Sequence, residues 1–352
     1  MDTIARSASW RSWLQYTASL NTDPWLTYST RVEQQLLLLG FAARTRTGCF
    51  GAKREVGHQT VEKAIRHVAQ TLVLAGRPDP RRPLHGGTDL DLPFTRLLKY
   101  YRDHDPAPRP LFAIPVFTVR AAAHLALVSP DPLAQATADL IVIAFFYLLR
   151  VGEYTTPDHP ARPTRTVPLR RQDIRFWRLD HSPIAHSSPL TELLAAHSAT
   201  IHLDNQKNGD RRATVHQNSC PTDAIFCPVK ALARRVHHIL VHATDPSTPL
   251  SFVGPSIHVS PRHILAAVRA AATTTRLTAD HGYDVSRVGA HSLRASGAMA
   301  LHLSGHTSAQ IKKIGRWKSD AFLSYLHSQI AAFTHGTSER MATDRPFHKV
   351  GG

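Results

Sequence analysis

Hydrophobic residues in the first hundred positions recur every three or four residues, the period of helices that bury one face. The clearest group holds Val61, Ile65, Val68 and Leu72. Two stretches rich in turn-forming residues, GCFGAKREVG and GRPDPRRPLHGG, separate the later groups. The pattern predicts four helices, one capped by Ser9 and the others spanning residues 31–44, 60–75 and 92–101.

A proline-rich segment, RDHDPAPRPLFAIP, follows these helices. Closely spaced prolines favour an extended and stiff connection. We therefore place a domain boundary near residue 112. The chain is expected to consist of a helical first domain with the linker at its end, a second domain, and a flexible tail, at residues 1–112, 113–330 and 331–352.

The pattern changes within the second domain. Helical spacing predicts helices over residues 117–127 and 132–150, and the second contains the apolar run LIVIAFFYLL. The segments VPLRRQDIRFWRL and TIHLDNQKNGDRRATVHQ have strand character, with Asn208-Gly209 as the turn of a hairpin. Helices are predicted again over residues 228–241, 260–274 and 282–330. The expected fold class is mainly α with a small antiparallel β-sheet or hairpin.

The charge of the chain points to an anionic partner. Its 42 Lys and Arg residues outnumber its 26 Asp and Glu residues, which gives a formal net charge of +16. Residues 1–110 contain 16 basic and 10 acidic side chains, so the excess is spread over both domains. Positive charge of this size favours nucleic acid as the partner. The alternatives are general solubility or an anionic membrane.

Composition argues against several other classes. Three cysteines cannot form a full disulfide framework, so we expect an intracellular protein, nuclear if the host is eukaryotic. The longest apolar run is too short to span a bilayer, and no membrane partner is expected. His216, Cys220 and Cys227 lack a fourth zinc ligand at finger spacing. Without a glycine-rich phosphate loop or a two-metal acidic cluster, neither an ATPase nor a metal nuclease is indicated, and we expect no metal and no cofactor.

Seven residues suited to phosphate chemistry stand in four separate places: Arg150 and Glu153 after the apolar run, Lys207 in the hairpin, His291 and Arg294 in HSLRASG, and Trp317 and Tyr325 in GRWKSDAFLSYLH. Taken singly, each has an ordinary structural interpretation. Arg150 would be a cation at a helix C-terminus, Lys207 a solvated charge, and Tyr325 part of a core. Together they suit a phosphate, because guanidinium groups bind its oxygens in a planar, bidentate way.

In this order the set resembles the tyrosine recombinase family, also called phage integrases. That family has an Arg at the end of an apolar helix with an acidic residue three later, a Lys on a β-hairpin, an H-x-x-R motif, a His or Trp after a turn that contains Gly, and a Tyr on the next helix. IGRWKSDAFLSYLH looks most like the eukaryotic branch carried by DIRS-type and Crypton mobile elements. The resemblance covers roughly residues 10–330, with an apparent insertion at residues 179–198.

The resemblance implies a two-domain DNA clamp, with a SAM-like core-binding domain before the catalytic domain. The activity would be that of a DNA strand transferase, a site-specific recombinase or integrase that breaks and rejoins DNA without metal or ATP. Tyr325 would attack the phosphorus and form a covalent 3′-phosphotyrosine link. Lys207 would protonate the departing 5′ oxygen.

The remaining site residues would surround the same phosphate. Arg150 and Arg294 would clamp its non-bridging oxygens, while His291 and Trp317 would donate hydrogen bonds to it or pack against it. Glu153 would orient the His or an Arg. Further DNA contacts are expected from five basic residues: Arg211, Arg212, Lys312, Lys313 and Lys318.

The resemblance also implies a homotetramer assembled on paired DNA sites. Two alternatives stay open. The chain could be a catalytically silent DNA-binding protein derived from a mobile-element recombinase, or an enzyme with the related chemistry of a type IB topoisomerase. Every position of the set is filled, which favours the active recombinase.

Overall fold

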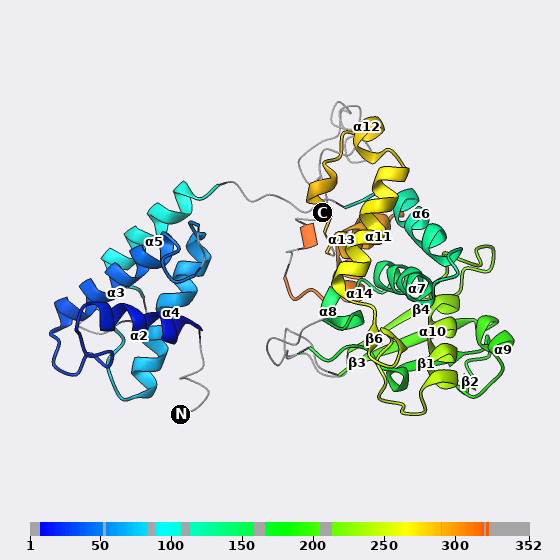
Figure 1. Cartoon of the computed structure of the whole chain (residues 1–352), viewed down its shortest axis with the longest axis horizontal. Coiled ribbons are helices and arrows are strands. Elements are labelled where there is room, and N and C mark those ends of the chain that lie inside the picture. The colour runs from blue at the N-terminus through cyan, green and yellow to red at the C-terminus, as the bar shows by residue number, and fades with distance from the viewer. Residues whose placement is uncertain are drawn as a thin grey trace, which may run out of the picture. The chain divides into compact units, whose positions relative to one another are not determined.

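The computed structural model of the chain describes residues 8–51, 54–83, 87, 89–106, 113–157, 166–204, 213–289, 291–319 and 322–323. The chain divides into two compact units, Met1–Pro108 and Arg109–Gly352. Helices dominate both units, and an antiparallel sheet lies in the second (Figure 1). The predicted fold class is confirmed.

The first unit contains the helices that the hydrophobic period predicts. They are α2 (Ala8–Ser19), α3 (Arg31–Arg46), α4 (His58–Leu74) and α5 (Leu92–His104). The apolar face of α4, with Val61 and Val68, is buried in one core with Trp13 and Phe41. The predicted cap at Ser9 is wrong, because α2 already includes the residue before it.

The second unit is built around α7 (Pro132–Phe146), which lies among the other helices of this unit in Figure 1. Every residue of α7 from Ala136 to Phe145 is buried. A helix that is apolar on all sides needs neighbours on all sides. The neighbours that contact it most are α6 (Val116–Leu127), α10 (Pro228–His242), α11 (Pro261–Thr274) and α13 (Ser292–Leu303). Within the described part of the chain, no helix is long and apolar enough to cross a membrane.

The apolar run does not remain helical as far as Arg150, so the prediction of one helix over residues 132–150 is wrong. Leu148 adopts the left-handed conformation with φ of +51°, and the N–H of Leu149 donates to the carbonyl of Ala144 at 3.0 Å. This arrangement ends a helix and usually employs glycine at the left-handed position. The chain then turns into the short helix α8 (Val151–Tyr154), with Arg150 as its N-cap residue.

The sheet has the strand order β2-β1-β3-β4, with each pair antiparallel. Its strands, preceded by the 3₁₀ turn η1 (Arg171–Asp173), are β1 (Ile174–Trp177), β2 (Pro183–Ile184), β3 (Ser198–Leu203) and β4 (Ala213–Asn218). The segment expected as an insertion supplies β2 and the short helix α9 (Leu190–Leu194). The predicted hairpin is formed by β3 and β4, while its predicted turn lies outside the described residues. A separate pair, β5 (Phe252–Gly254) and β6 (Ile257–His258), completes the strands described.

Two hydrogen bonds fix the β3–β4 hairpin against the end of α7. The Tyr147 hydroxyl, at the C-cap of α7, donates to the carbonyl of Ala199 in β3 at 3.1 Å. The side-chain amide of Gln217 in β4 donates to the carbonyl of Phe146 at 2.7 Å. The hairpin is therefore held against the turn that carries Arg150.

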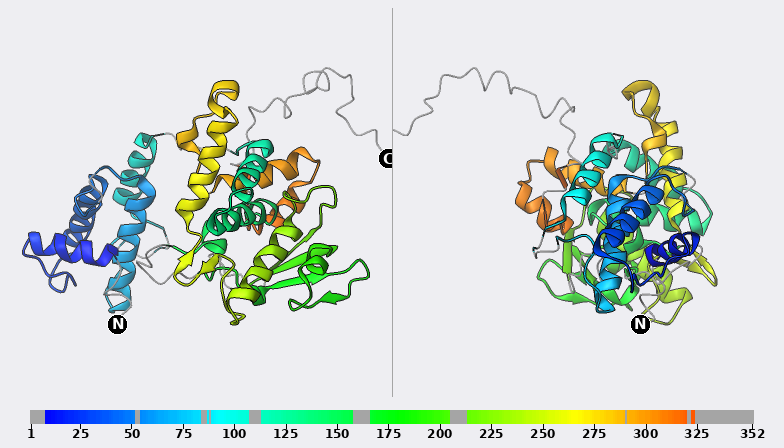
Figure 2. Two further views of the ribbon diagram at one scale, coloured as in Figure 1. Left: turned by 45° about the vertical axis from the view of Figure 1, so that its right-hand side comes forward. Right: turned by 90° about the vertical axis from the view of Figure 1, so that its left-hand side faces the viewer.

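The sequence predicted one helical stretch over residues 282–330. The described part of this segment instead contains several short elements. They are the 3₁₀ turn η2 (Val285–Arg287), α13 and α14 (Ser308–Gly315), and they follow the short helix α12 (Leu277–His281). Gly282 ends α12 with φ of +67°, which explains the first interruption. Figure 2 shows α13 and α14, in orange, together beside α7.

Close approach of α13 to α7 depends on Gly297. A Cβ at this position would lie 2.3 Å from the backbone oxygen of Phe145. Only glycine allows the two helix backbones to come this close without a shift. This contact brings the H-x-x-R segment against the end of α7.

Candidate active site

The first part of the site is the turn from α7 into α8. The backbone N–H of Arg150 donates to Glu153 Oε2 at 2.8 Å, and its Nη1 donates to Glu153 Oε1 at 2.9 Å. The Glu153 side chain is only 1% exposed, whereas that of Arg150 is 19% exposed. The buried Glu153 therefore fixes Arg150, while part of the Arg150 guanidinium stays accessible to solvent.

Arg294 reaches the same turn from α13, although 144 residues separate it from Arg150. Its two terminal nitrogens donate to the carbonyls of Leu148 and Gly315, and the residue is 2% exposed. Its guanidinium carbon lies 4.3 Å from the centre of the Trp317 ring. Stacking on an aromatic face stabilises a guanidinium, so Trp317 covers Arg294 rather than standing apart from it.

Arg316 is a third arginine of this site, and the sequence reasoning missed it. It follows α14 as the C-cap residue, in the left-handed conformation with φ of +58°. Its Nη2 donates to Glu153 Oε2 at 2.9 Å and to the carbonyl of Leu148 at 3.1 Å. The only signal in the sequence was an arginine between Gly315 and Trp317, at a position where a helix usually ends in glycine.

We call Arg150, Glu153, Arg294 and Arg316 the arginine cluster. Burial lowers the pKa of the Arg316 guanidinium from its usual value, with Glu153 opposing this effect and Arg150 adding to it. Within the cluster, the guanidinium groups of Arg150 and Arg316 share the single carboxylate of Glu153, so these two arginines have a positive excess. Buried charge without a counterion is costly. The arrangement therefore favours an anionic ligand beside Arg150, such as a phosphate.

An apolar layer supports the cluster from beneath. Leu148, Ala298, Ile311 and Phe322 form one buried group, with Trp317 packed against it. The rings of Trp317 and Phe322 lie 5.7 Å apart, centre to centre. A Cβ on Gly315 would come within 1.6 Å of the Trp317 ring, so that ring rests directly on the end of α14.

The other residues proposed from the sequence fall into two groups. His291 is the N-cap residue of α13 and is exposed, one turn before the buried Arg294. Lys312 on α14 is partly exposed, whereas Lys313 and Lys318 are exposed. Four proposed residues lie outside the described part of the chain: Lys207, Arg211, Arg212 and Tyr325. The structure thus brings together Arg150, Glu153, Arg294 and Trp317.

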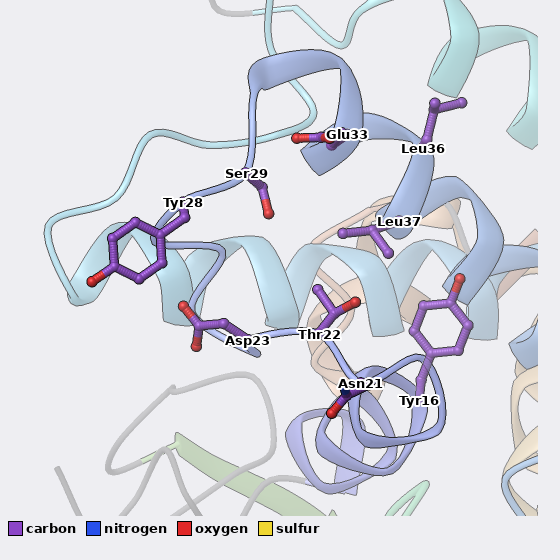
Figure 3. Close-up of a pocket in the computed structure, with 9 residues that line it drawn as sticks. All are labelled: Tyr16, Asn21, Thr22, Asp23, Tyr28, Ser29, Glu33, Leu36 and Leu37. Atoms are coloured by element: carbon purple, nitrogen blue, oxygen red, sulfur yellow. The ribbon is translucent and has the colours of Figure 1, made fainter.

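The first unit contains a hollow of about 610 Å³ lined by residues of α2, of α3 and of their connection (Figure 3). Its two carboxylates already have structural partners. Asp23 accepts hydrogen bonds from the backbone N–H groups of Trp25 and Thr27, and Glu33 caps α3 through Thr30. Since turn and helix cap account for both carboxylates, we assign no chemistry to this hollow. Among the described residues, no group of three or more His, Cys, Asp or Glu side chains is placed to hold a metal ion.

Comparison with known proteins gives similarity at the level of structure. No family model and no curated protein matches the sequence. The XerH site-specific recombinase bound to difH substrate in a pre-cleavage complex matches with a TM-score of 0.50 and 12% identity, over 95% of this chain and 77% of that one. The Tn1549 transposon integrase in complex with transposon right end DNA gives 0.48 and 10%, over 88% and 85%. XerA recombinase gives 0.41 and 16%, over 96% and 91%.

The match to XerH shows a shared fold, because it extends over nearly the whole of this chain. At 12% identity it does not by itself assign an activity. The chain therefore has the fold of a site-specific recombinase, and its function has to be argued from the arginine cluster.

Proposed function

We propose that the chain is a tyrosine recombinase, an enzyme that cuts and rejoins DNA strands through a covalent 3′-phosphotyrosine intermediate. The observation that carries the proposal is the positive excess of the arginine cluster, assembled from three separate parts of the sequence. The recombinase fold and the net charge of +16 support it. Both point to a polyanionic substrate whose phosphates are the reacting groups.

In this proposal the cluster stabilises the charge that develops on the phosphate. Arg150, open to solvent on one side, would bind a non-bridging oxygen while Glu153 keeps its guanidinium in place. Arg294 would bind a second oxygen by exchanging one of its backbone carbonyl partners for the phosphate. Trp317 and His291 would flank the same group. Removing one such donor typically slows catalysis by about a hundredfold to a thousandfold.

Tyr325 is the proposed nucleophile. Its support is the position of Phe322, which is fully buried beside Trp317 in the layer below the cluster. Three residues of chain span at most about 11 Å, so covalent connection keeps Tyr325 in the neighbourhood of Phe322. A phenol has a pKa near 10, and guanidinium groups close to it would favour the phenolate that attacks phosphorus.

Lys207 is the proposed general acid. It belongs to the connection between β3 and β4, and hydrogen bonds from both strands hold this hairpin against the end of α7. A lysine on such a connection could protonate the 5′ oxygen as it leaves, which an alkoxide requires. Arg211, Arg212, Lys312, Lys313 and Lys318 would bind the DNA backbone.

From the resemblance of the IGRWKSDAFLSYLH segment, we further propose an oligomeric state, a type of mobile element and a cellular location. The first unit would act as the core-binding domain, and four protomers would assemble on paired double-stranded DNA sites. The chain would belong with recombinases of DIRS-type and Crypton mobile elements and would act in the nucleus of a eukaryotic host. No metal or ATP would take part in the reaction.

One observation favours the catalytically silent alternative. Arg294 is 2% exposed, and both of its terminal nitrogens are engaged by backbone carbonyls. A guanidinium with only a structural role would have these contacts, and such a protein would bind DNA without cutting it.

An adduct assay separates the two functions. A nicked duplex that loses a short fragment on cleavage traps the covalent intermediate, which survives SDS. We expect an adduct with the wild type and none with Tyr325→Phe, while both bind the duplex with equal affinity. Binding by the wild type without any adduct over a range of duplex sequences would support the silent alternative.

A further inference from the structure

We infer that Arg316 is a positioning residue. It fixes the carboxylate of Glu153, and thereby Arg150, while it joins the end of α14 to the turn before α8. This inference rests on the proposed function for its catalytic consequence, since it assigns a role within the same site. Its structural part can be tested without any assay of recombination.

The contacts of Arg316 converge on the groups that hold Arg150. Glu153 Oε2 accepts both the backbone N–H of Arg150 at 2.8 Å and Nη2 of Arg316 at 2.9 Å. The other carboxylate oxygen accepts Nη1 of Arg150 at 2.9 Å. Both carboxylate oxygens are therefore engaged, and loss of Arg316 would leave the carboxylate with the two donors of Arg150 alone.

Arg316 also shares an acceptor with Arg294. The carbonyl of Leu148 accepts from Nη1 of Arg294 and from Nη2 of Arg316. Leu148 is the left-handed residue at the end of α7, so its carbonyl is presented toward both arginines by the backbone turn. Arg316 is thus a direct connection between the two arginines proposed to bind phosphate.

The backbone around Arg316 shows that the side chain is not there to cap the helix. A left-handed position after a helix favours glycine, which adopts it without strain. Arg316 instead buries a long cation whose Nε and Nη1 have no hydrogen-bond partner within the described residues. The left-handed backbone, the burial of the charge and the unpaired donors each make an arginine at position 316 unfavourable. The contacts with Glu153 and Leu148 must offset these costs.

Arg316 also fixes the position of the residues that follow it. Trp317, the next residue, lies over the guanidinium of Arg294, and Phe322 is buried beside its ring. If Arg316 were released from the turn before α8, these two side chains would lose their fixed support. The proposed nucleophile follows three residues after Phe322.

Arg316→Gly is the sharpest test, because glycine suits the backbone conformation and removes only the side chain. Arg276→Gly is a matched control, since Arg276 is also left-handed with φ of +51° but its side chain is 72% exposed. We measure hydrogen exchange at the Arg150 amide, which donates to Glu153 Oε2. Arg316→Gly should speed this exchange at least tenfold, and Arg276→Gly should leave it unchanged. Equal exchange in the two variants would overturn the inference whether or not the protein recombines DNA.

The catalytic consequence is measured as the single-turnover rate of adduct formation on a nicked duplex. Arg316→Gly should slow this rate at least thirtyfold at unchanged DNA affinity. In the Glu153→Gln background the same substitution should slow it less than threefold, because the carboxylate through which Arg316 acts is gone. A merely structural role predicts the same slowing in both backgrounds, and that result would overturn the positioning role.

Failure of the proposed function gives a different pattern. If the wild type forms no adduct, the proposed function fails, and the exchange at the Arg150 amide alone decides the inference. If the wild type forms an adduct and Arg316→Gly matches Arg276→Gly in rate, the proposed function stands and the positioning role is overturned.

Discussion

Glu153→Gln removes the shared carboxylate charge of the arginine cluster while keeping the shape of the side chain. In the wild type, this buried carboxylate accepts three hydrogen bonds, two from Arg150 and one from Arg316. The glutamine oxygen can accept the hydrogen bonds of only one carboxylate oxygen, and the amide group in place of the other would face a donor of Arg150 or Arg316. The substitution therefore leaves Arg150 and Arg316 without their shared counterion.

The size of the effect follows from burial. Removing one partner of a buried ion pair costs about 3–5 kcal/mol, because the remaining charge is left uncompensated. Since the glutamine retains one acceptor, we expect the lower end, about 3 kcal/mol of unfolding free energy. Asp280→Asn is the control, because Asp280 pairs with Arg276 at 3.4 Å while 49% exposed. An exposed pair of this kind contributes about 0.2–1 kcal/mol.

Urea unfolding followed by intrinsic fluorescence measures both variants. Sulfate gives a second observation, because an anion that binds only the folded state stabilises it. Sulfate should therefore raise the stability of Glu153→Gln more than that of the wild type. A loss below about 1 kcal/mol, similar to that of an exposed pair, together with equal responses to sulfate, would refute the view that Glu153 is the shared counterion of two buried arginines.

Three further predictions concern other parts of the chain. Gly297→Ala should destabilise the protein by about 1–3 kcal/mol in the same urea assay, because the alanine Cβ would lie 2.3 Å from the backbone oxygen of Phe145. Gly254→Ala is the control and should not destabilise the protein, because its Cβ would have no atom within 4 Å. Hydrogen bonds, first from the His58 backbone N–H and then from the His58 ring, lower the pKa of Asp105 from 3.8 to about 2. The stability advantage of wild type over Asp105→Asn should therefore disappear as the pH falls from 4 towards 2. An advantage that stays the same over this range would contradict this. Lys207→Ala should be slow on ordinary DNA but near wild type on DNA with a 5′-bridging sulfur, because a thiolate leaves without protonation; no rescue would move the role of acid to another residue.

The sequence predicted those features that depend on local pattern. Helical period located α4 and α11, and the alternation on both sides of the QKNGD segment located β3 and β4. Arg150 and Glu153 are only three residues apart, and the short helix that follows Arg150 brings their side chains together. These elements are determined by residues that lie close together in the chain.

The sequence did not reveal features that depend on distant contacts. Nothing within LIVIAFFYLL signals a break, since neither glycine nor proline is present, yet Leu148 is left-handed. Its conformation is supported by two arginines more than 140 residues away. For the same reason Arg316 could not be recognised, because its partners are known only once α14 packs near the end of α7.

Peptide mapping of the trapped adduct tests whether Tyr325 forms a covalent bond to DNA. The wild type is incubated with a nicked duplex, the SDS-stable product is digested with protease and nuclease, and the modified peptide is sequenced by mass spectrometry. We predict one nucleotide joined through its 3′ phosphate to Tyr325, in the peptide that also contains Phe322. A nucleotide on any other residue, or one joined through its 5′ phosphate, would contradict the account.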